Sequence, residues 1–260
     1  MGVPESYSAA PTRTVGADLP APERVLAIGA HPDDIEFGCG ATLAKWAAAG
    51  CEVSHLICTD GSKGTWDADV DSASLVATRQ GEQRAAARAV GGHDDRVVFL
   101  GWPDGELECG LRQRWEIAYW IRKFRPDVVL GHDPWRRYRL HPDHRNAGFL
   151  TTDGIVAARD PKFFPEQAIA PHRPSALLLW EAEEPDHVES IGEHDLDAKI
   201  QALLAHESQF ETTMRIANMS TSTEVRQFAQ RVRDRAARVA ATAGIDGLDA
   251  AEGFKILRDL

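Results

Sequence analysis

The segment Arg24–Asp34, RVLAIGAHPDD, joins an apolar run to a polar motif, and it decides the fold that we expect. Its first part, RVLAIGA, is short and almost free of polar side chains. Near-continuous apolar runs are typical of strands that are covered on both faces, as in parallel sheets. Four similar runs follow along the chain: 52–59 (EVSHLICT), 96–101 (RVVFLG), 127–131 (DVVLG) and 175–180 (SALLLW).

Helical patterns alternate with these runs. We expect helices over 40–49, 71–90, 111–124, 142–159, 196–206 and 222–243. A strand, a helix and a strand in repeated succession indicate a series of right-handed βαβ units. The sequence therefore predicts an α/β, Rossmann-like three-layer fold, with a mainly parallel central sheet and helices on both faces. In such sheets ligands bind beyond the carboxyl ends of the strands.

Length and composition indicate one domain. The chain has 260 residues, of which 43% are hydrophobic, and this is enough to bury a sizeable core. We expect a single domain over 23–260. The preceding residues, 1–22, are rich in Pro, Ala and Ser, and they predict a flexible leader.

Several functional classes are disfavoured by the composition. No apolar run approaches the ~20 residues of a membrane-spanning helix, and the N-terminus lacks the apolar stretch of a signal peptide. We therefore expect a cytoplasmic protein without membrane insertion. The four cysteines form no C-x-x-C pair and predict reduced thiols. A net charge of −11 disfavours nucleic acid as a partner, because the phosphate backbone would repel the chain.

Two polar motifs follow predicted strands and predict a metal site. His31-Pro32-Asp33-Asp34 follows the first strand, and His141-Pro142-Asp143-His144 comes about ten residues after the fourth. Either motif alone is compatible with a turn, since Pro and Asp are turn residues. Together they place metal-ligating side chains at one edge of the sheet. A catalytic zinc takes three protein ligands and keeps one position for water, and we expect His31, Asp34 and His144 to be those ligands.

The other polar side chains of the two motifs then predict catalytic roles. A carboxylate beside a metal that acidifies water is suited to be a general base, and this role falls to Asp33. We expect His141 to stabilise an oxyanion or to give a proton to a leaving amine. Asp143 is expected to fix the tautomer and orientation of that imidazole.

The paired motifs resemble those of the LmbE-like, or PIG-L-type, N-acetylglucosamine deacetylase superfamily. The resemblance runs from about Arg24 to the C-terminus. It implies the same roles: zinc ligands at the three positions named above, with Asp33 as base, His141 at the oxyanion or leaving group, and Asp143 tuning His141. It also implies a hydrolase that removes an N-acetyl or other N-acyl group from an amino-sugar-containing small molecule or glycoconjugate. A homo-oligomer is a further expectation from the family.

Weaker matches suggest how substrate is held. Arg79, at the start of Arg79-Gln80-Gly81-Glu82, and Asp104, within Trp102-Pro103-Asp104-Gly105, resemble substrate-contacting positions of the family. The polar loop 60–74 is interpreted as a lid that borders the site. One departure concerns the position two residues before His141, where some sugar deacetylases have a tyrosine and this chain has Arg139.

Two alternatives stay open from the residues alone. His31-x-Asp33 with His144 also fits the two-His, one-carboxylate triad of non-haem iron oxygenases, and nitrogen and oxygen ligands accept Fe²⁺ as well as Zn²⁺. The second alternative is a non-catalytic binding module of Rossmann type. The chain lacks the phosphate-binding loop that such modules usually have, because no G-x-G-x-x-G follows the first strand.

Overall fold

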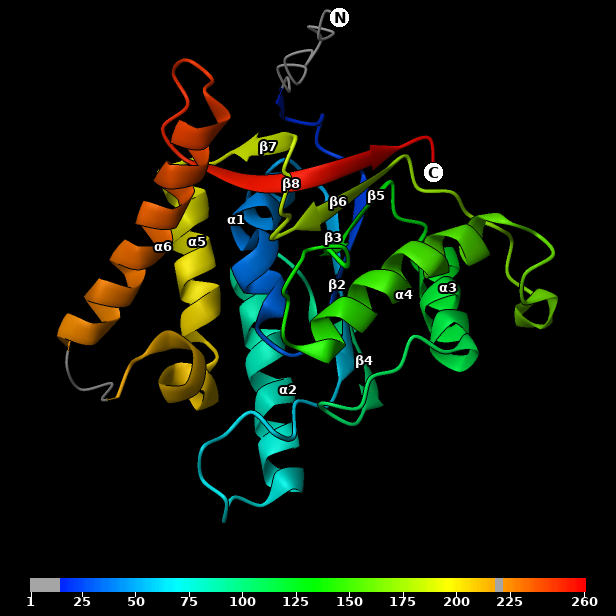
Figure 1. Ribbon diagram of the computed structural model, residues 1–260, viewed down its shortest axis with the longest axis horizontal. Coiled ribbons are helices and arrows are strands. Elements are labelled where there is room, and N and C mark those ends of the chain that lie inside the picture. Colours follow the sequence, from blue (N-terminus) through cyan, green and yellow to red (C-terminus); the bar gives the residue numbers. More distant parts are fainter. Residues whose placement is uncertain (1–14, 218–221) are drawn as a thin grey trace, which may run out of the picture.

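A single sheet organises the computed structural model, which describes residues 15–217 and 222–260. Eight strands of the described residues form it in the order β1-β7-β8-β6-β5-β2-β3-β4 (Figure 1). They are β1 (Gly16–Ala17), β2 (Arg24–Gly29), β3 (Glu52–Thr59), β4 (Val97–Trp102), β5 (Val128–His132), β6 (Ala176–Trp180), β7 (His187–Ser190) and β8 (Ala251–Arg258). All neighbouring pairs are parallel except the two that β8 makes with β6 and β7. The expected mainly parallel sheet is therefore confirmed.

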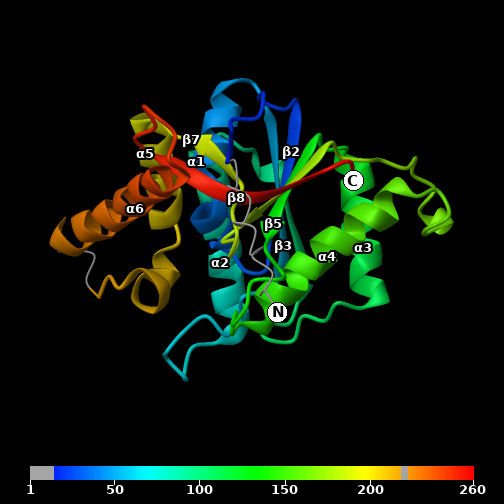
Figure 2. The same ribbon diagram turned by 45° about the horizontal axis from the view of Figure 1, so that its top comes forward.

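Helices cover both faces of the sheet, as Figure 2 shows. The long helices are α1 (Asp34–Ala48), α2 (Ser72–Ala89), α3 (Leu111–Phe124), α4 (Pro142–Arg159), α5 (Glu193–Leu204) and α6 (Ser222–Ala243). Alternate side chains of β2 point to opposite faces, as the pleat requires. Val25 and Ala27 join a core with α1, α2 and α5, whereas Leu26 and Ile28 join a core with α3 and α4. This arrangement is the predicted three-layer fold.

The elements differ most from the prediction in three places. Helix α1 begins at Asp34, six residues before the expected start at 40, because the polar motif 31–34 ends inside it: Asp33 is its N-cap and Asp34 its first residue. Strands β7 and β8 were not expected. Their sequences, HVES and AEGFKILR, mix charged and apolar residues, and the ionisable side chains of His187, Glu189 and Glu252 are buried.

Part of the segment that we expected to be a leader belongs to the sheet. Residues 1–14 lie outside the described residues. Gly16 and Ala17 form β1 and pair with β7, and the carboxylate of Asp18 receives a hydrogen bond from Nζ of Lys45 at 2.8 Å. In the described part of the chain, no helix is long and apolar enough to cross a membrane.

The topology creates a crevice between β2 and β5. These neighbouring parallel strands continue into helices on opposite faces, β2 into α1 and β5 into α4. Such a switch point is where open α/β sheets bind their ligands. Both polar motifs lie there, since 30–34 follows β2 and 141–144 begins α4.

Candidate active site

Three expected metal ligands converge at this crevice. The nitrogen and oxygen atoms that His31, Asp34 and His144 offer all lie within 4.8 Å of one another. Nε2 of His144 is 3.2 Å from Oδ1 of Asp34, and Nδ1 of His31 is 3.3 Å from Oδ2. Two imidazoles and a carboxylate are a donor set that suits a divalent zinc or iron ion, so these residues fit the expected metal.

The buried side chain of His132, at the end of β5, supports these three residues. The indole Nε1–H of Trp180 donates to Nδ1 of His132 at 3.0 Å. Because an indole can only donate, Nδ1 must be the acceptor, and the ring proton of neutral His132 lies on Nε2. That proton faces Oδ2 of Asp34, 3.2 Å away, whereas the Ala30 N–H approaches Nε2 at the longer distance of 3.4 Å. Burial lowers the pKa of His132 and favours this neutral form.

Close packing holds Trp180 and His132 in place. A Cβ at Gly38 on α1 would lie 2.5 Å from the ring of Trp180, and a Cβ at Gly148 on α4 would lie 2.6 Å from the carbonyl oxygen of His132. The two glycines therefore allow the helices on opposite faces to approach the strand ends. The result is a chain of contacts from Trp180 through His132 to the carboxylate of Asp34.

Asp33 is held in a strained conformation beside the three expected metal ligands. Its φ of 97° is in the left-handed region, which residues other than glycine rarely adopt. Oε1 of Gln83 accepts a hydrogen bond from the Asp33 N–H, and Nη2 of Arg79 donates to the carbonyl of Pro32. Oδ2 of Asp33 is buried without a hydrogen-bond partner among the described residues, and burial raises the pKa of this carboxyl to about 6.

His31 is surrounded by carboxylates. Its Nε2 is 3.1 Å from Oδ1 of Asp104 and 3.1 Å from Oδ2 of Asp143. Burial opposes protonation of this ring, but its contacts with the carboxylates outweigh burial and raise its pKa well above the usual value. The Asp143 carboxylate also accepts hydrogen bonds from the N–H groups of Gly105 and Leu107.

These contacts change what we expected of Asp143. Its carboxylate bonds to His31 and to the loop after β4, and not to the imidazole of His141. The reason is that α4 begins at Pro142, so the first turn directs Asp143 inward, where it is fully buried. His141, in contrast, is the exposed N-cap residue, whose Nδ1 accepts from the Asp143 N–H at 3.3 Å. That bond leaves the proton of a neutral His141 on Nε2.

The expected substrate contacts lie in the wall of one cavity. This cavity has a volume of about 600 Å³, and its lining includes the three expected metal ligands together with Asp33, Arg79, Asp104 and His141. Arg79 is only 3% exposed, and its Nη1 donates to the carbonyl of Gly61 at 2.8 Å. It therefore holds loop 60–74 against the site in addition to facing the cavity.

The loop 60–74 borders this cavity through residues 63–66. Figure 1 shows the segment between β3 and α2 projecting from the body of the molecule. Trp66 is 74% exposed although it lines the cavity, and Nε2 of Gln209 donates to the carbonyl of Gly64 at 2.9 Å. One end of the loop is thus anchored and its middle is open to solvent.

Sequence reasoning missed the supporting residues. His132, Trp180, Gln83 and Glu181 had no assigned role, although His132 and Trp180 end strands at the edge where ligands bind. Arg139, at the position where some relatives have tyrosine, is buried. Its Nη2 lies 2.9 Å from the Glu181 carboxylate, and its Nη1 lies 3.3 Å from Nδ1 of both His132 and His144.

Comparison with known proteins agrees with this geometry. The family described as PIG-L, GlcNAc-PI de-N-acetylase, matches residues 26–155. The chain belongs to the PIG-L family. Like other members, it is a deacetylase, that is, an amidohydrolase. The diacetylchitobiose deacetylase of Thermococcus kodakarensis is 37% identical over 191 residues, covering 72% of this chain and 70% of that protein.

Further PIG-L relatives and structures extend the likeness. The 1D-myo-inositol 2-acetamido-2-deoxy-alpha-D-glucopyranoside deacetylase of Streptomyces avermitilis is 34% identical over 175 residues, and these span 57% of this chain and 58% of that protein. The structure of N,N'-diacetylchitobiose deacetylase from Pyrococcus horikoshii superimposes with a TM-score of 0.79 at 29% identity. It covers 91% of this chain and 84% of that chain.

Proposed function

We propose that this PIG-L family member hydrolyses the amide of an N-acetylated amino sugar or a related N-acylated glycoconjugate, with Zn²⁺ held by His31, Asp34 and His144. One observation carries the proposal: three metal-ligating side chains converge at the switch point of the sheet beside the buried Oδ2 of Asp33, which accepts no hydrogen bond from the described residues and lies 3.8 Å from Nη2 of Arg79. The deacetylases with which the chain shares 34–37% identity support the substrate class.

The metal site would activate the reaction when it is loaded. A bound divalent ion supplies Lewis acidity, which polarises an acyl carbonyl and makes water more acidic. His132 and Trp180 hold the carboxylate of Asp34 in orientation for that ion, and partners of this kind tune a metal site.

Asp33 acts as the general base. Asp33 lines the cavity, and its Oδ2 accepts no hydrogen bond from the described residues, with only the ion pair to Arg79 at 3.8 Å, so this carboxylate can accept a proton from the attacking water. The water oxygen bonds to the acyl carbon, and the electron pair of the carbonyl bond moves to the acyl oxygen, which becomes an oxyanion. When the carbonyl re-forms, the C–N bond breaks and the amine must gain a proton. Protonated Asp33 can return the proton that it took, which leaves a free amine and a carboxylic acid.

His141 stabilises the oxyanion. Its Nδ1 is occupied by the Asp143 N–H, so the Nε2–H of the neutral ring is the group available to the cavity. A donor that is already oriented stabilises charge that develops on the acyl oxygen. Arg79 and Asp104 line the same cavity, and we propose that they contact the sugar hydroxyls.

No observation supports either alternative function, the non-haem iron oxygenase or the non-catalytic binding module. The oxygenase hypothesis needs Asp33 as a ligand, but the group that converges contains Asp34, and the fold is α/β. The non-catalytic hypothesis does not account for membership of a deacetylase family.

The test combines metal analysis with a substrate panel. Protein purified with zinc is assayed against N-acetylglucosamine, diacetylchitobiose and N-acetylglucosaminyl-inositol, and free amine is quantified. We expect amine release that a chelator abolishes and that zinc restores. Failure of zinc-loaded protein to release amine from every member of the panel contradicts the proposal.

A further inference from the structure

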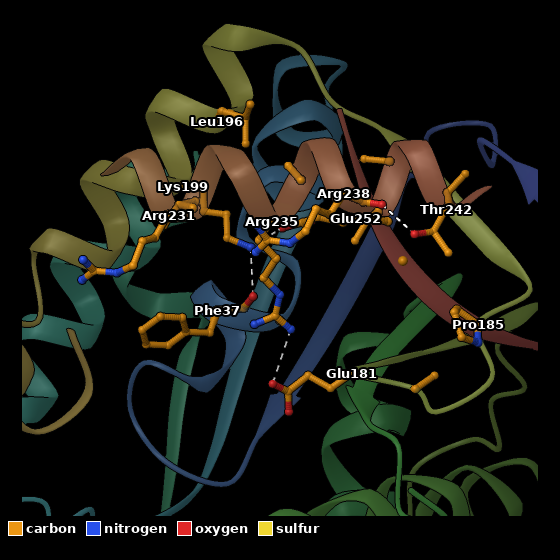
Figure 3. Close-up of a pocket in the computed structure, with 18 of the residues that line it drawn as sticks. Phe37, Glu181, Pro185, Leu196, Lys199, Arg231, Arg235, Arg238, Thr242 and Glu252 are labelled. Atoms are coloured by element: carbon orange, nitrogen blue, oxygen red, sulfur yellow. Dashed lines mark hydrogen bonds and ion pairs between the residues drawn. The ribbon is translucent and has the colours of Figure 1, made fainter. Parts of the chain in front are cut away.

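A second cavity adjoins the catalytic one. It has a volume of about 640 Å³ and lies among α6, β8 and the start of α1; we call it the α6 pocket (Figure 3). Phe37, Gly38, Glu181 and Thr213 line both cavities. These four residues place the two cavities side by side, within reach of a single extended ligand.

The α6 pocket has an excess of positive charge. Five cationic side chains and two carboxylates line it: Lys199, Arg215, Arg231, Arg235, Arg238, Glu181 and Glu252. Three of the arginines come from one helix, α6. In a chain with a net charge of −11, this concentration of guanidinium groups is a local reversal of sign.

Both carboxylates already have partners within the protein. Oε1 of Glu252 accepts from Nζ of Lys199 at 2.5 Å, and its Oε2 accepts from the Thr42 hydroxyl at 2.6 Å. Glu181 is 2.9 Å from Nη2 of Arg139 and 3.5 Å from Nη2 of Arg235, which reaches across the pocket to it in Figure 3. The carboxylates therefore do not neutralise all the guanidinium groups of α6.

The remainder of the lining is largely apolar. Phe37 and Phe228 meet edge to face with their ring centroids 6.4 Å apart, and Leu196, Val232 and Val239 complete this wall. A pocket with an apolar wall and guanidinium groups on one helix suits a ligand group that has an apolar body and a negative charge.

We propose that the α6 pocket binds an aglycone that carries a carboxylate on an apolar body, so that the preferred substrates are anionic glycoconjugates and not simple sugars. The inference rests on the proposed function. It deepens that function, because the amide sits in the catalytic cavity while the acidic arm sits on the arginines of α6.

A pair of matched ligands tests this. The 4-carboxyphenyl and 4-carbamoylphenyl glycosides of N-acetylglucosamine differ in charge but hardly in shape. Binding of each to the zinc-loaded protein is measured by calorimetry, and amine release is measured in parallel. We expect the carboxylate ligand to bind about tenfold more tightly, as a hydrogen bond to a charged group would give, and the preference to fall as salt is added.

The variant Arg231→Gln/Arg238→Gln should lose the preference and bind the carboxylate ligand and the neutral ligand equally. Arg226→Gln, on the same helix but outside the pocket lining, should keep it. Equal binding of the two ligands to the wild type, or a preference that survives in the double variant, overturns the inference. Absence of amine release from both ligands contradicts the proposed function instead, and the binding comparison still decides the role of the pocket.

Discussion

The contact between Trp180 and His132 predicts that a residue that is not a metal ligand controls metal affinity. Trp180→Phe keeps an aromatic ring but removes the N–H that donates to Nδ1 of His132 at 3.0 Å. The imidazole is then free to carry its proton on Nδ1. In that tautomer, a lone pair on Nε2 faces the Asp34 carboxylate at 3.2 Å. Asp34, an expected zinc ligand, then loses the hydrogen bond that orients it.

The size of the expected loss of zinc affinity depends on what replaces the lost hydrogen bond. An unsatisfied buried acceptor costs about 1–3 kcal/mol, and loss of a partner that orients a ligand typically lowers metal affinity about 10–100-fold. Nη1 of Arg139 is 3.3 Å from the same Nδ1 of His132 and can compensate in part. We therefore expect the lower end of that range, about a tenfold loss of zinc affinity.

The assay is competition for zinc with a chromophoric chelator, alongside urea unfolding. Trp46→Phe is the matched control, because Trp46 is as buried as Trp180 but its Nε1 has no hydrogen-bond partner among the described residues. Both variants should lose stability through the smaller ring, and only Trp180→Phe should lose zinc affinity. If the two variants bind zinc equally well, the tautomer argument is refuted.

Three further predictions concern the base, the packing and the sheet edge. Asp33→Asn should bind zinc normally in metal analysis but lose about 10²–10⁴-fold in kcat, and near-normal turnover would exclude Asp33 as the base. Gly38→Ala should lower the free energy of unfolding in urea by about 1–3 kcal/mol through overpacking, whereas Gly81→Ala, with open space around its Cβ, should not lower it. Burial raises the pKa of Asp18, but its bonds to Lys45 and Ser190 outweigh burial and lower it, so the stabilisation is present above the ordinary value of 3.8 and is lost as the pH falls below it. Asp18→Asn should therefore cost under about 1 kcal/mol at neutral pH and nothing in strong acid, and a cost that persists in acid would contradict this.

The sequence predicted those parts of the fold that depend on local pattern. Strands β2 to β6 are apolar runs, and helices α3 and α4 have the expected boundaries. Strands β7 and β8 escaped prediction because their pairing depends on distant partners, such as Val188 with Gly253. The start of α1 was predicted too late, because the polar residues 31–34 gave no helical pattern although the helix begins at Asp34.

The sequence likewise predicted part of the candidate site. Residue types and strand ends were enough to select His31, Asp34 and His144, which the fold brings together. The partner of Asp143 was not predictable, because it depends on how the loop after β4 packs on the start of α4. His132 was missed for the same reason, since only the packing of Trp180 against Gly38 gives that histidine a role.

The most direct measurement is the metal content of zinc-equilibrated protein after dialysis, for the wild type, His144→Ala and His194→Ala. His194 has an exposed side chain and lies outside the converging group, so it serves as the control. Our account predicts one equivalent of zinc in the wild type and the control, and almost none in His144→Ala. A His144→Ala protein that is folded and retains a full equivalent would contradict the central claim that His31, Asp34 and His144 share one ion.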